Sequence, residues 1–147
     1  MRKHGCKVYQ SARPHTVARE VSRLFVLALL DRGRLRAAGD PVPEGRITLY
    51  RGVSGRGRAR RVRGISWTGT LDCARWFAGR GGAIGNQADP AVYRLELDAD
   101  EVLAHLTNRS EDEYLVALTR HHRPARLEAV TPELFDVVTK RWREERS

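Results

Sequence analysis

Short apolar or alternating segments, separated by turn residues, dominate the central part of this chain. Side chains in a strand alternate with a period of two, so such segments predict β-strands. They occur at residues 47–52, 64–68, 91–97, 113–118 and 125–130. The pattern does not define the order of these strands in a sheet.

Apolar residues at helical spacing predict helices over residues 16–33, 72–77 and 131–142. Thr16 is the expected N-cap of the first helix and Gly33 its stop. A further short helix is expected from Asp98 or Asp100 through Leu106. The glycines and prolines at residues 34–46, 52–64 and 79–90 predict connecting loops.

The chain has 147 residues, which is enough for one domain spanning residues 1–147. Its hydrophobic fraction of 41% suffices for a core. Its 27 Lys and Arg exceed its 18 Asp and Glu, giving a formal net charge of +9, and the cations concentrate between Arg56 and Arg63. This surplus indicates an acidic partner, such as a dinucleotide, a nucleic acid or an acidic protein surface, without choosing among them.

Two cysteines, Cys6 and Cys73, are too few for a zinc site, and free thiols are the expected state. The apolar run at residues 24–30 is shorter than the ~20 residues of a membrane span. It also starts too far from the first residue for a secretion signal. His121 and His122 are adjacent and would point apart, which disfavours a metal role. These features predict a cytoplasmic protein without a metal site.

The acidic pair Glu111 and Glu113 opens an apolar strand-like segment, where the period of two places both carboxylates on one side. Like charges held this close favour a cationic or hydroxyl-rich ligand, although a solvated acidic turn would give the same pattern. Arg51, followed by Gly52, ends an earlier strand, where a guanidinium and a closely approachable backbone would be available.

A second strand carries Ser66 and Thr68 on one face and leads into a helix with an Ala-x-x-Phe pattern. In this order, the Arg, Ser-x-Thr and Glu-x-Glu elements over residues 47–118 resemble the three signatures of the mono-ADP-ribosyltransferase family, in its arginine, serine and glutamate branch. The resemblance implies an α+β fold of two packed, mostly antiparallel sheets with flanking helices. It also implies an enzyme that transfers ADP-ribose from NAD⁺ to a macromolecule.

By this resemblance, the catalytic residues would be Glu113, Glu111 and Ser66. Glu113 would hold the ribose 2′-hydroxyl of NAD⁺ and stabilise positive charge on the ribose as nicotinamide leaves. Glu111 would orient or deprotonate the acceptor, and an acid at its position favours an arginine side chain as acceptor. Ser66 would hydrogen-bond Glu113 and fix its direction.

The same resemblance assigns five residues to NAD⁺ binding. Arg51 would clamp the phosphates, and Gly52 would leave its backbone open to the nicotinamide amide. Thr68 would belong to the same site, chiefly by securing the junction between its strand and the helix that follows. Trp76 or Phe77 would stack on nicotinamide, although both also suit the core of a helix face. Trp67, which points away from Ser66, is expected in the core.

These observations together suggest a small bacterial or phage effector or toxin, acting in the cytoplasm of its own or of a target cell. Its acceptor would be an acidic protein or a nucleic acid, contacted through the arginines between Arg56 and Arg63. Two alternatives remain open. An NAD⁺ glycohydrolase would use the same site with water as acceptor, and a non-enzymatic basic module would bind nucleic acid through the arginines alone.

Overall fold

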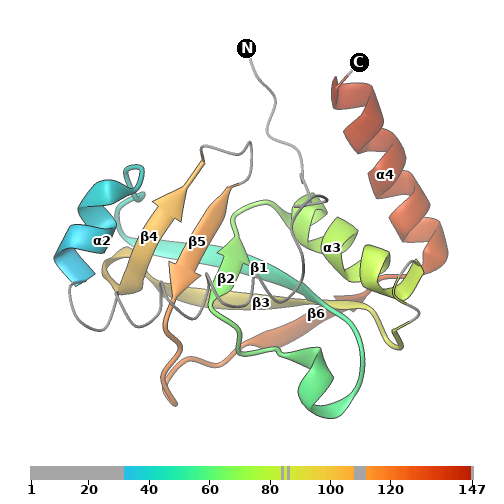
Figure 1. The fold of residues 1–147 in the computed structure, drawn as a ribbon, viewed down its shortest axis with the longest axis horizontal. Coiled ribbons are helices and arrows are strands. Elements are labelled where there is room, and N and C mark those ends of the chain that lie inside the picture. Colours follow the sequence, from blue (N-terminus) through green and yellow to red (C-terminus); the bar gives the residue numbers. More distant parts are fainter. Residues whose placement is uncertain (1–31, 84, 86, 108–111, 147) are drawn as a thin grey trace.

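The computed structural model describes residues 32–83, 85, 87–107 and 112–146, and in this part of the chain six strands form one antiparallel sheet flanked by helices (Figure 1). The elements in chain order are α2 (Arg32–Ala38), β1 (Arg46–Val53), the 3-10 helix η1 (Gly57–Arg60), β2 (Ser66–Thr68), α3 (Leu71–Ala83), β3 (Ala91–Asp98), the 3-10 helix η2 (Ala99–Glu101), β4 (Val102–Leu106), β5 (Glu113–Val116), β6 (Ala125–Ala129) and α4 (Pro132–Arg146). The expected α+β class is confirmed.

The sheet has a weak joint in its middle. Its strand order is β4-β5-β2-β1-β3-β6, and β1 pairs with β3 along its whole length. With β2, however, β1 pairs only at Tyr50 opposite Thr68. Figure 1 shows the strands on the two sides of this joint running in different directions. The expectation of two packed sheets is wrong, because the Tyr50–Thr68 pair joins all the described strands into one sheet.

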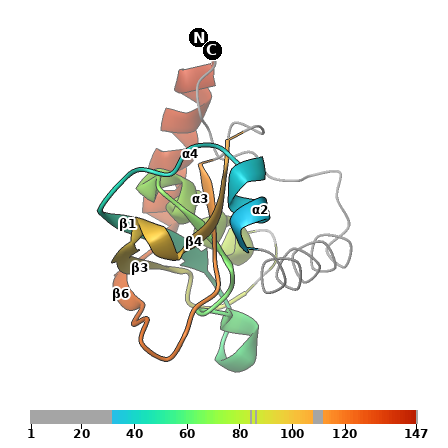
Figure 2. The ribbon, with the colours of Figure 1, turned by 90° about the vertical axis from the view of Figure 1, so that its left-hand side faces the viewer.

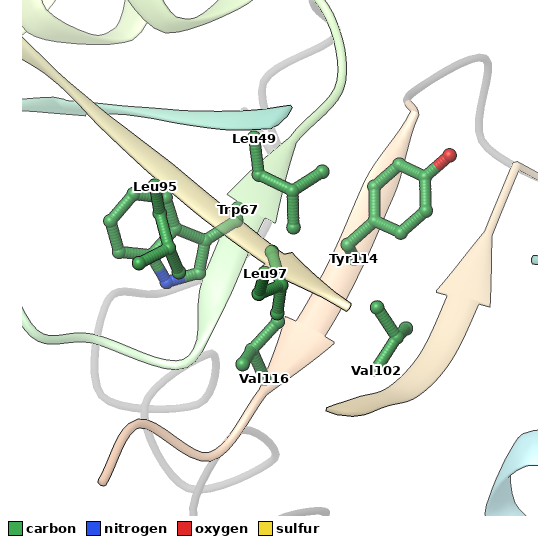
Figure 3. Packing of buried hydrophobic residues seen from close by; sticks show 7 residues of the cluster. All are labelled: Leu49, Trp67, Leu95, Leu97, Val102, Tyr114 and Val116. Carbon is green, nitrogen blue, oxygen red and sulfur yellow. The ribbon is translucent and has the colours of Figure 1, made fainter. Parts of the chain in front are cut away.

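Side chains from both halves of this sheet meet in the main core cluster (Figure 3). Its buried members are Leu49, Trp67, Leu95, Leu97, Val102, Tyr114 and Val116. Trp67 is 2% exposed, as expected for the core, and its indole N–H donates to the Gly64 carbonyl at 2.9 Å. Burying each such side chain contributes roughly 1.5–3 kcal/mol relative to exposing it. The cluster therefore stabilises the fold across the weak joint.

Helices α3 and α4 pack at the end of the sheet opposite α2 (Figure 1). Glycine allows both contacts of α3. A Cβ on Gly52 of β1 would lie 1.9 Å from the Ala74 carbonyl oxygen, and one on Gly79 would lie 2.3 Å from Phe135 Cδ1 of α4. The glycines therefore set how closely α3 approaches β1 and α4. Within the described residues, no helix combines the length and the apolar character needed to cross a membrane.

The short helix α2 lies beside β4, at the front of the view in Figure 2. Leu35 packs against a buried cluster from β4 and β5. The Arg36 guanidinium donates to the carbonyl oxygens of Ala99 at 2.8 Å and Val102 at 3.0 Å. These contacts hold a helix in residues 32–38, although its sequence contains a glycine and few apolar residues.

Three expectations for local structure are wrong, because tertiary contacts outweigh local preference. Residues 34–46 were expected to lack a regular element, but α2 covers the first of them and contains Gly33, the expected stop. Helix α3 continues through the first glycines of the expected loop. Asp98 caps only η2, and the residues that follow it form β4 instead of a helix. The expected helix over residues 16–33 lies outside the described residues up to residue 31.

Candidate functional site

Ser66 and Glu113 are joined by a hydrogen bond across the β2–β5 pair. Thr68 lies opposite Glu113, and Ser66 lies opposite Leu115, so the side chains of Ser66 and Glu113 project from the same face. The Ser66 hydroxyl donates to Glu113 Oε2 at 2.6 Å. The other carboxylate oxygen, Oε1, has no hydrogen-bond partner among the described residues. The contact expected between Ser66 and Glu113 is therefore present, and one oxygen is left available.

Arg51 reaches Ser66 from β1, where β1 and β2 separate. Its Nη1 donates to the Ser66 carbonyl oxygen at 2.6 Å, and its Nε donates to the Arg61 carbonyl oxygen at 2.9 Å. Gly64 makes room for the guanidinium, since a Cβ there would lie 2.3 Å from Arg51 Nη2. The guanidinium thus occupies the gap between the diverging strands. Two consecutive contacts through Ser66 connect Arg51 with Glu113.

The positive charge of Arg51 is poorly compensated. Burial, and then repulsion from Arg61, lower the pKa of Arg51 to about 10. Among the described residues, no carboxylate forms an ion pair with Arg51. Arg51 is half-buried, so its guanidinium has lost part of its hydration, and the described groups that bond it are neutral carbonyls. An anionic ligand placed beside Arg51 would remove this penalty.

Gly52 and Thr68 have structural roles that explain their residue types. Gly52 was expected to leave its backbone open to a ligand, but the structure shows that glycine is required there by the approach of α3. The Thr68 hydroxyl accepts a hydrogen bond from the Thr70 N–H at 3.1 Å, which secures the junction of β2 with α3 as expected. These contacts give no support for a direct role of either residue in NAD⁺ binding.

Trp76 and Phe77 lie in the interface between α3 and α4. Trp76 is 6% exposed and its ring lies 5.6 Å from that of Trp142, while Phe77 packs edge-on against Trp76 at 5.5 Å. Both belong to the cluster around Cys73 and Val138. Trp76 is therefore a core residue and Phe77 is half-buried against it, and their stacking on nicotinamide stays a prediction.

Glu111 lies outside the described residues, so its place beside Glu113 stays a prediction. The residue between the two acids, Asp112, contacts His105, with Asp112 Oδ1 at 2.6 Å from His105 Nε2. The His105 ring stacks on Tyr114 with centroids 4.1 Å apart. Sequence reasoning missed this cluster. The available signal was the strand period, which places Asp112 and Tyr114 on the face opposite Glu113.

Both ring nitrogens of His105 face oxygen acceptors. Nδ1 lies 2.7 Å from the Pro41 carbonyl oxygen, and Nε2 faces the Asp112 carboxylate. Neither group has a proton to donate when Asp112 is ionised, and a neutral ring could donate to only one of them. Burial, and then the negative charge of Asp112, raise the pKa of Tyr114 to about 12. The cluster therefore places the His105 ring between a carboxylate and a carbonyl group, stacked on a neutral phenol.

Thr107, the residue before residues 108–111, is held by hydrogen bonds to Asp40. Asp40 Oδ2 accepts hydrogen bonds from the Thr107 hydroxyl and the Thr107 N–H, both at 2.7 Å. These two bonds, the hydroxyl one foremost, lower the pKa of Asp40. Thr107 and Asp112, the residues on either side of this segment, are thus both fixed to the fold.

His122 also has structural partners. It is 7% exposed, its Nε2 lies 3.0 Å from Glu101 Oε1, and its Nδ1 accepts from the Thr119 N–H at 2.8 Å. Across the part of the chain that the structure covers, no group of three or more His, Cys, Asp or Glu is placed to hold a metal ion. Cys73, which is a free thiol, is buried between α3 and α4.

Similarity to known proteins does not add to this picture. No protein-family model, curated protein or solved structure matches the chain. Any functional conclusion therefore depends on the contacts of Arg51, Ser66 and Glu113.

Proposed function

We propose that this protein is an NAD⁺-dependent mono-ADP-ribosyltransferase that modifies a macromolecule, and that its α+β fold is related to the fold of that family. The observation that carries the proposal is the Ser66–Glu113 hydrogen bond beside the Arg51 guanidinium. Ser66 and Glu113 are 47 residues apart in the chain. A chance match to three short motifs would not be expected to bring all three motif residues into one connected group.

Glu113 has the chemistry that the proposed reaction needs. The bond between the ribose carbon and the nicotinamide nitrogen breaks, its electron pair leaves with nicotinamide, and positive charge builds on the ribose. Oε1 of Glu113 would accept a hydrogen bond from the ribose 2′-hydroxyl and stabilise this charge, while Ser66 holds Oε2. Orienting the carboxylate in advance avoids the free-energy cost of ordering it during the reaction.

The acceptor completes the transfer. Its nucleophilic atom donates an electron pair to the ribose carbon, and its proton passes to a base. The residue proposed as this base is Glu111, which the strand period would place on the side of Glu113. Its negative charge would also suit a guanidinium acceptor.

Arg51 is the proposed ligand of the NAD⁺ pyrophosphate. With a pKa lowered to about 10, it is still charged at neutral pH, and a phosphate group would supply the missing counter-ion. Its guanidinium stays planar and keeps several donors, so it can bind phosphate while it still bonds the two carbonyl groups.

This role predicts that inorganic pyrophosphate stabilises the protein. At 100 times its Kd, the ligand should raise the free energy of unfolding by about 2.7 kcal/mol. We expect a rise in melting temperature for the parent protein and for Arg94→Gln, which changes an exposed residue of β3, but not for Arg51→Gln. Equal stabilisation of all three proteins would contradict the phosphate role of Arg51.

The direct test of the proposed function is incubation with labelled NAD⁺ and a cell lysate. We expect label on a macromolecule with the parent protein. We expect almost none with Glu113→Gln, which keeps the size of the side chain and removes its charge. The proposal fails if neither protein nor nucleic acid is labelled and the two proteins release nicotinamide at the same rate.

The same assay distinguishes transfer from hydrolysis. An NAD⁺ glycohydrolase would release nicotinamide in a Glu113-dependent manner without labelling any macromolecule. The variant Glu111→Gln sharpens this distinction, because loss of labelling with retained nicotinamide release would assign Glu111 to the acceptor.

A further inference from the structure

Seven arginines lie on two chain segments that contact each other, and they are here called the arginine surface. Its members are Arg58, Arg60, Arg61, Arg63, Arg120, Arg123 and Arg126. Residues 54–63 and 117–127, which contain them, include no Asp or Glu. None of the seven forms an ion pair with a carboxylate of the described residues. Their charges therefore remain uncompensated by this part of the protein.

Specific contacts bring the two segments together. Arg63 donates to backbone carbonyl groups of the turn at residues 119–122. Arg126 of β6 lies opposite Tyr93 of β3, and the Arg60 guanidinium lies 5.6 Å from the centre of the Tyr93 ring. Opposite residues of neighbouring strands share a face of the sheet, so Arg60 and Arg126 both lie beside Tyr93. Both segments lie at the lower end of the molecule in Figures 1 and 2.

The arginine surface is held in place by the fold. Arg60 Nη1 donates to the carbonyl oxygens of Gly55 at 3.0 Å and Asp89 at 2.6 Å. The backbone of Arg61 accepts from Arg51 at 2.9 Å. Residues 52–64 were expected to be a loop, yet these contacts order Arg60 and Arg61 before any partner binds. Less conformational entropy is then lost on binding.

The surroundings of these cations favour a polyanion whose charges lie on its outside. Single-stranded nucleic acids bind through exposed aromatic rings on which their bases stack. Protein partners usually bury an aromatic or apolar centre. No Phe, Tyr or Trp side chain among the described residues is exposed, and Tyr93 is half-buried with Arg60 over it. A duplex needs neither contact, because its phosphates line the outside and its bases are already stacked.

We propose that the arginine surface binds the phosphate backbone of duplex nucleic acid without reading its sequence. The proposal concerns binding alone and does not depend on the proposed transfer reaction. In a cell, it would hold the protein on duplex nucleic acid, close to other molecules bound there.

Fluorescence anisotropy with a labelled duplex DNA of mixed sequence, titrated at several salt concentrations, tests the proposal. We compare Arg58→Gln/Arg126→Gln with Arg46→Gln/Arg94→Gln, which also removes two exposed arginines but outside the arginine surface. In the first variant, we expect binding about 10-fold weaker or more at roughly 0.1 M salt, and a salt slope smaller by about 2. The second variant should bind like the parent. Arg58→Lys/Arg126→Lys, which keeps both charges, should retain most of the affinity.

Equal losses in the two glutamine variants would overturn the proposal, because binding would then follow net charge and not this surface. Tighter binding to single-stranded DNA or to polyglutamate than to the duplex at the same salt concentration would also overturn it. NAD⁺ labelling by the same variants keeps the two proposals separate. Failure of NAD⁺ labelling in the parent would leave the duplex-binding result intact, and failure of duplex binding would leave the labelling result intact.

Discussion

Asp112 and Glu113 are adjacent carboxylates at the start of β5, and their surroundings are opposite. Asp112 lies 2.6 Å from the ring nitrogen Nε2 of His105, whose other ring nitrogen faces the Pro41 carbonyl oxygen. Glu113 is held at the same distance by the neutral hydroxyl of Ser66. Among the described residues, one carboxylate thus has an imidazole partner, and the other has only a hydroxyl group.

Arg51 extends the comparison to a positive charge. It too is held by neutral groups, the carbonyl oxygens of Ser66 and Arg61. At Asp112, which anchors the chain, the partner is an imidazole ring that can carry a positive charge. At Glu113 and Arg51, where charges are proposed to act on a ligand, the partners among the described residues are hydroxyl and carbonyl groups. These fix the direction of a charged group without neutralising it.

The largest expected effect comes from neutralising each of the two acids in turn. Glu113→Gln should lower the transfer rate on the order of 10²–10³-fold, because it removes the charge opposite the developing cation, with little change in melting temperature. Asp112→Asn should do the reverse and mainly lower the melting temperature. Rate and melting measurements on both variants check this. Similar changes in transfer rate and melting temperature for the two variants would contradict the contrast between Asp112 and Glu113.

The next effect concerns the His105–Asp112 pair. Both side chains of the pair are mostly buried. We therefore expect a coupling free energy of about 1–3 kcal/mol in a double-mutant cycle of His105→Gln and Asp112→Asn, with the free energy of unfolding measured in urea. Ser66→Ala with Glu113→Gln provides the matched cycle on the other face. If the comparison of Asp112 with Glu113 holds, the coupling free energy of His105 with Asp112 exceeds that of Ser66 with Glu113.

A smaller effect is expected from Ser66→Ala alone. Glu113 keeps its charge in this variant but loses its orientation, so kcat should fall by roughly 10-fold, less than in Glu113→Gln. Ser66→Thr restores a hydroxyl and should recover part of the lost rate. A loss in Ser66→Ala as large as that in Glu113→Gln would mean that Ser66 does more than position the carboxylate.

The smallest effect is expected at Asp40, and it depends on pH. The hydrogen bonds from Thr107 lower the folded-state pKa of Asp40 below its ordinary value. The group then stabilises the fold above the unfolded-state pKa, and this contribution is lost as the pH falls through the folded-state value. The melting difference between the parent and Asp40→Asn should therefore be largest near neutral pH and shrink below about pH 4. A difference that grows in acid would contradict this assignment.

Strand periodicity predicted much of the sheet correctly. Residues 47–52, 91–97 and 125–130 lie within or closely match β1, β3 and β6, and the proline and acid at residues 132 and 133 correctly predicted the start of α4. The same period predicted the shared face of Ser66 and Thr68. It also predicted that Trp67 is in the core. Each of these features depends on neighbours in the sequence, which is why the sequence alone is sufficient for them.

Features that depend on distant partners were not predictable in this way. The segment of β4 reads equally well as a helix, and pairing with β5 decides between the two. Trp76 suits a ligand-stacking ring as well as a core residue, and only the approach of α4 makes it a core residue. The His105–Asp112 contact forms across two strands, so neither residue alone signals it.

By itself, the sequence determined the class of the fold, most strand positions and the three motifs that make Arg51, Ser66 and Glu113 candidates. Only the tertiary structure decided that the Arg51 guanidinium bonds the Ser66 backbone while the Ser66 hydroxyl bonds Glu113, and that, among the described residues, Asp112 has an imidazole partner and Glu113 has none. The physical reason is that periodicity acts over a few residues. Compensation of a charge, in contrast, depends on which groups the whole fold brings within hydrogen-bonding distance.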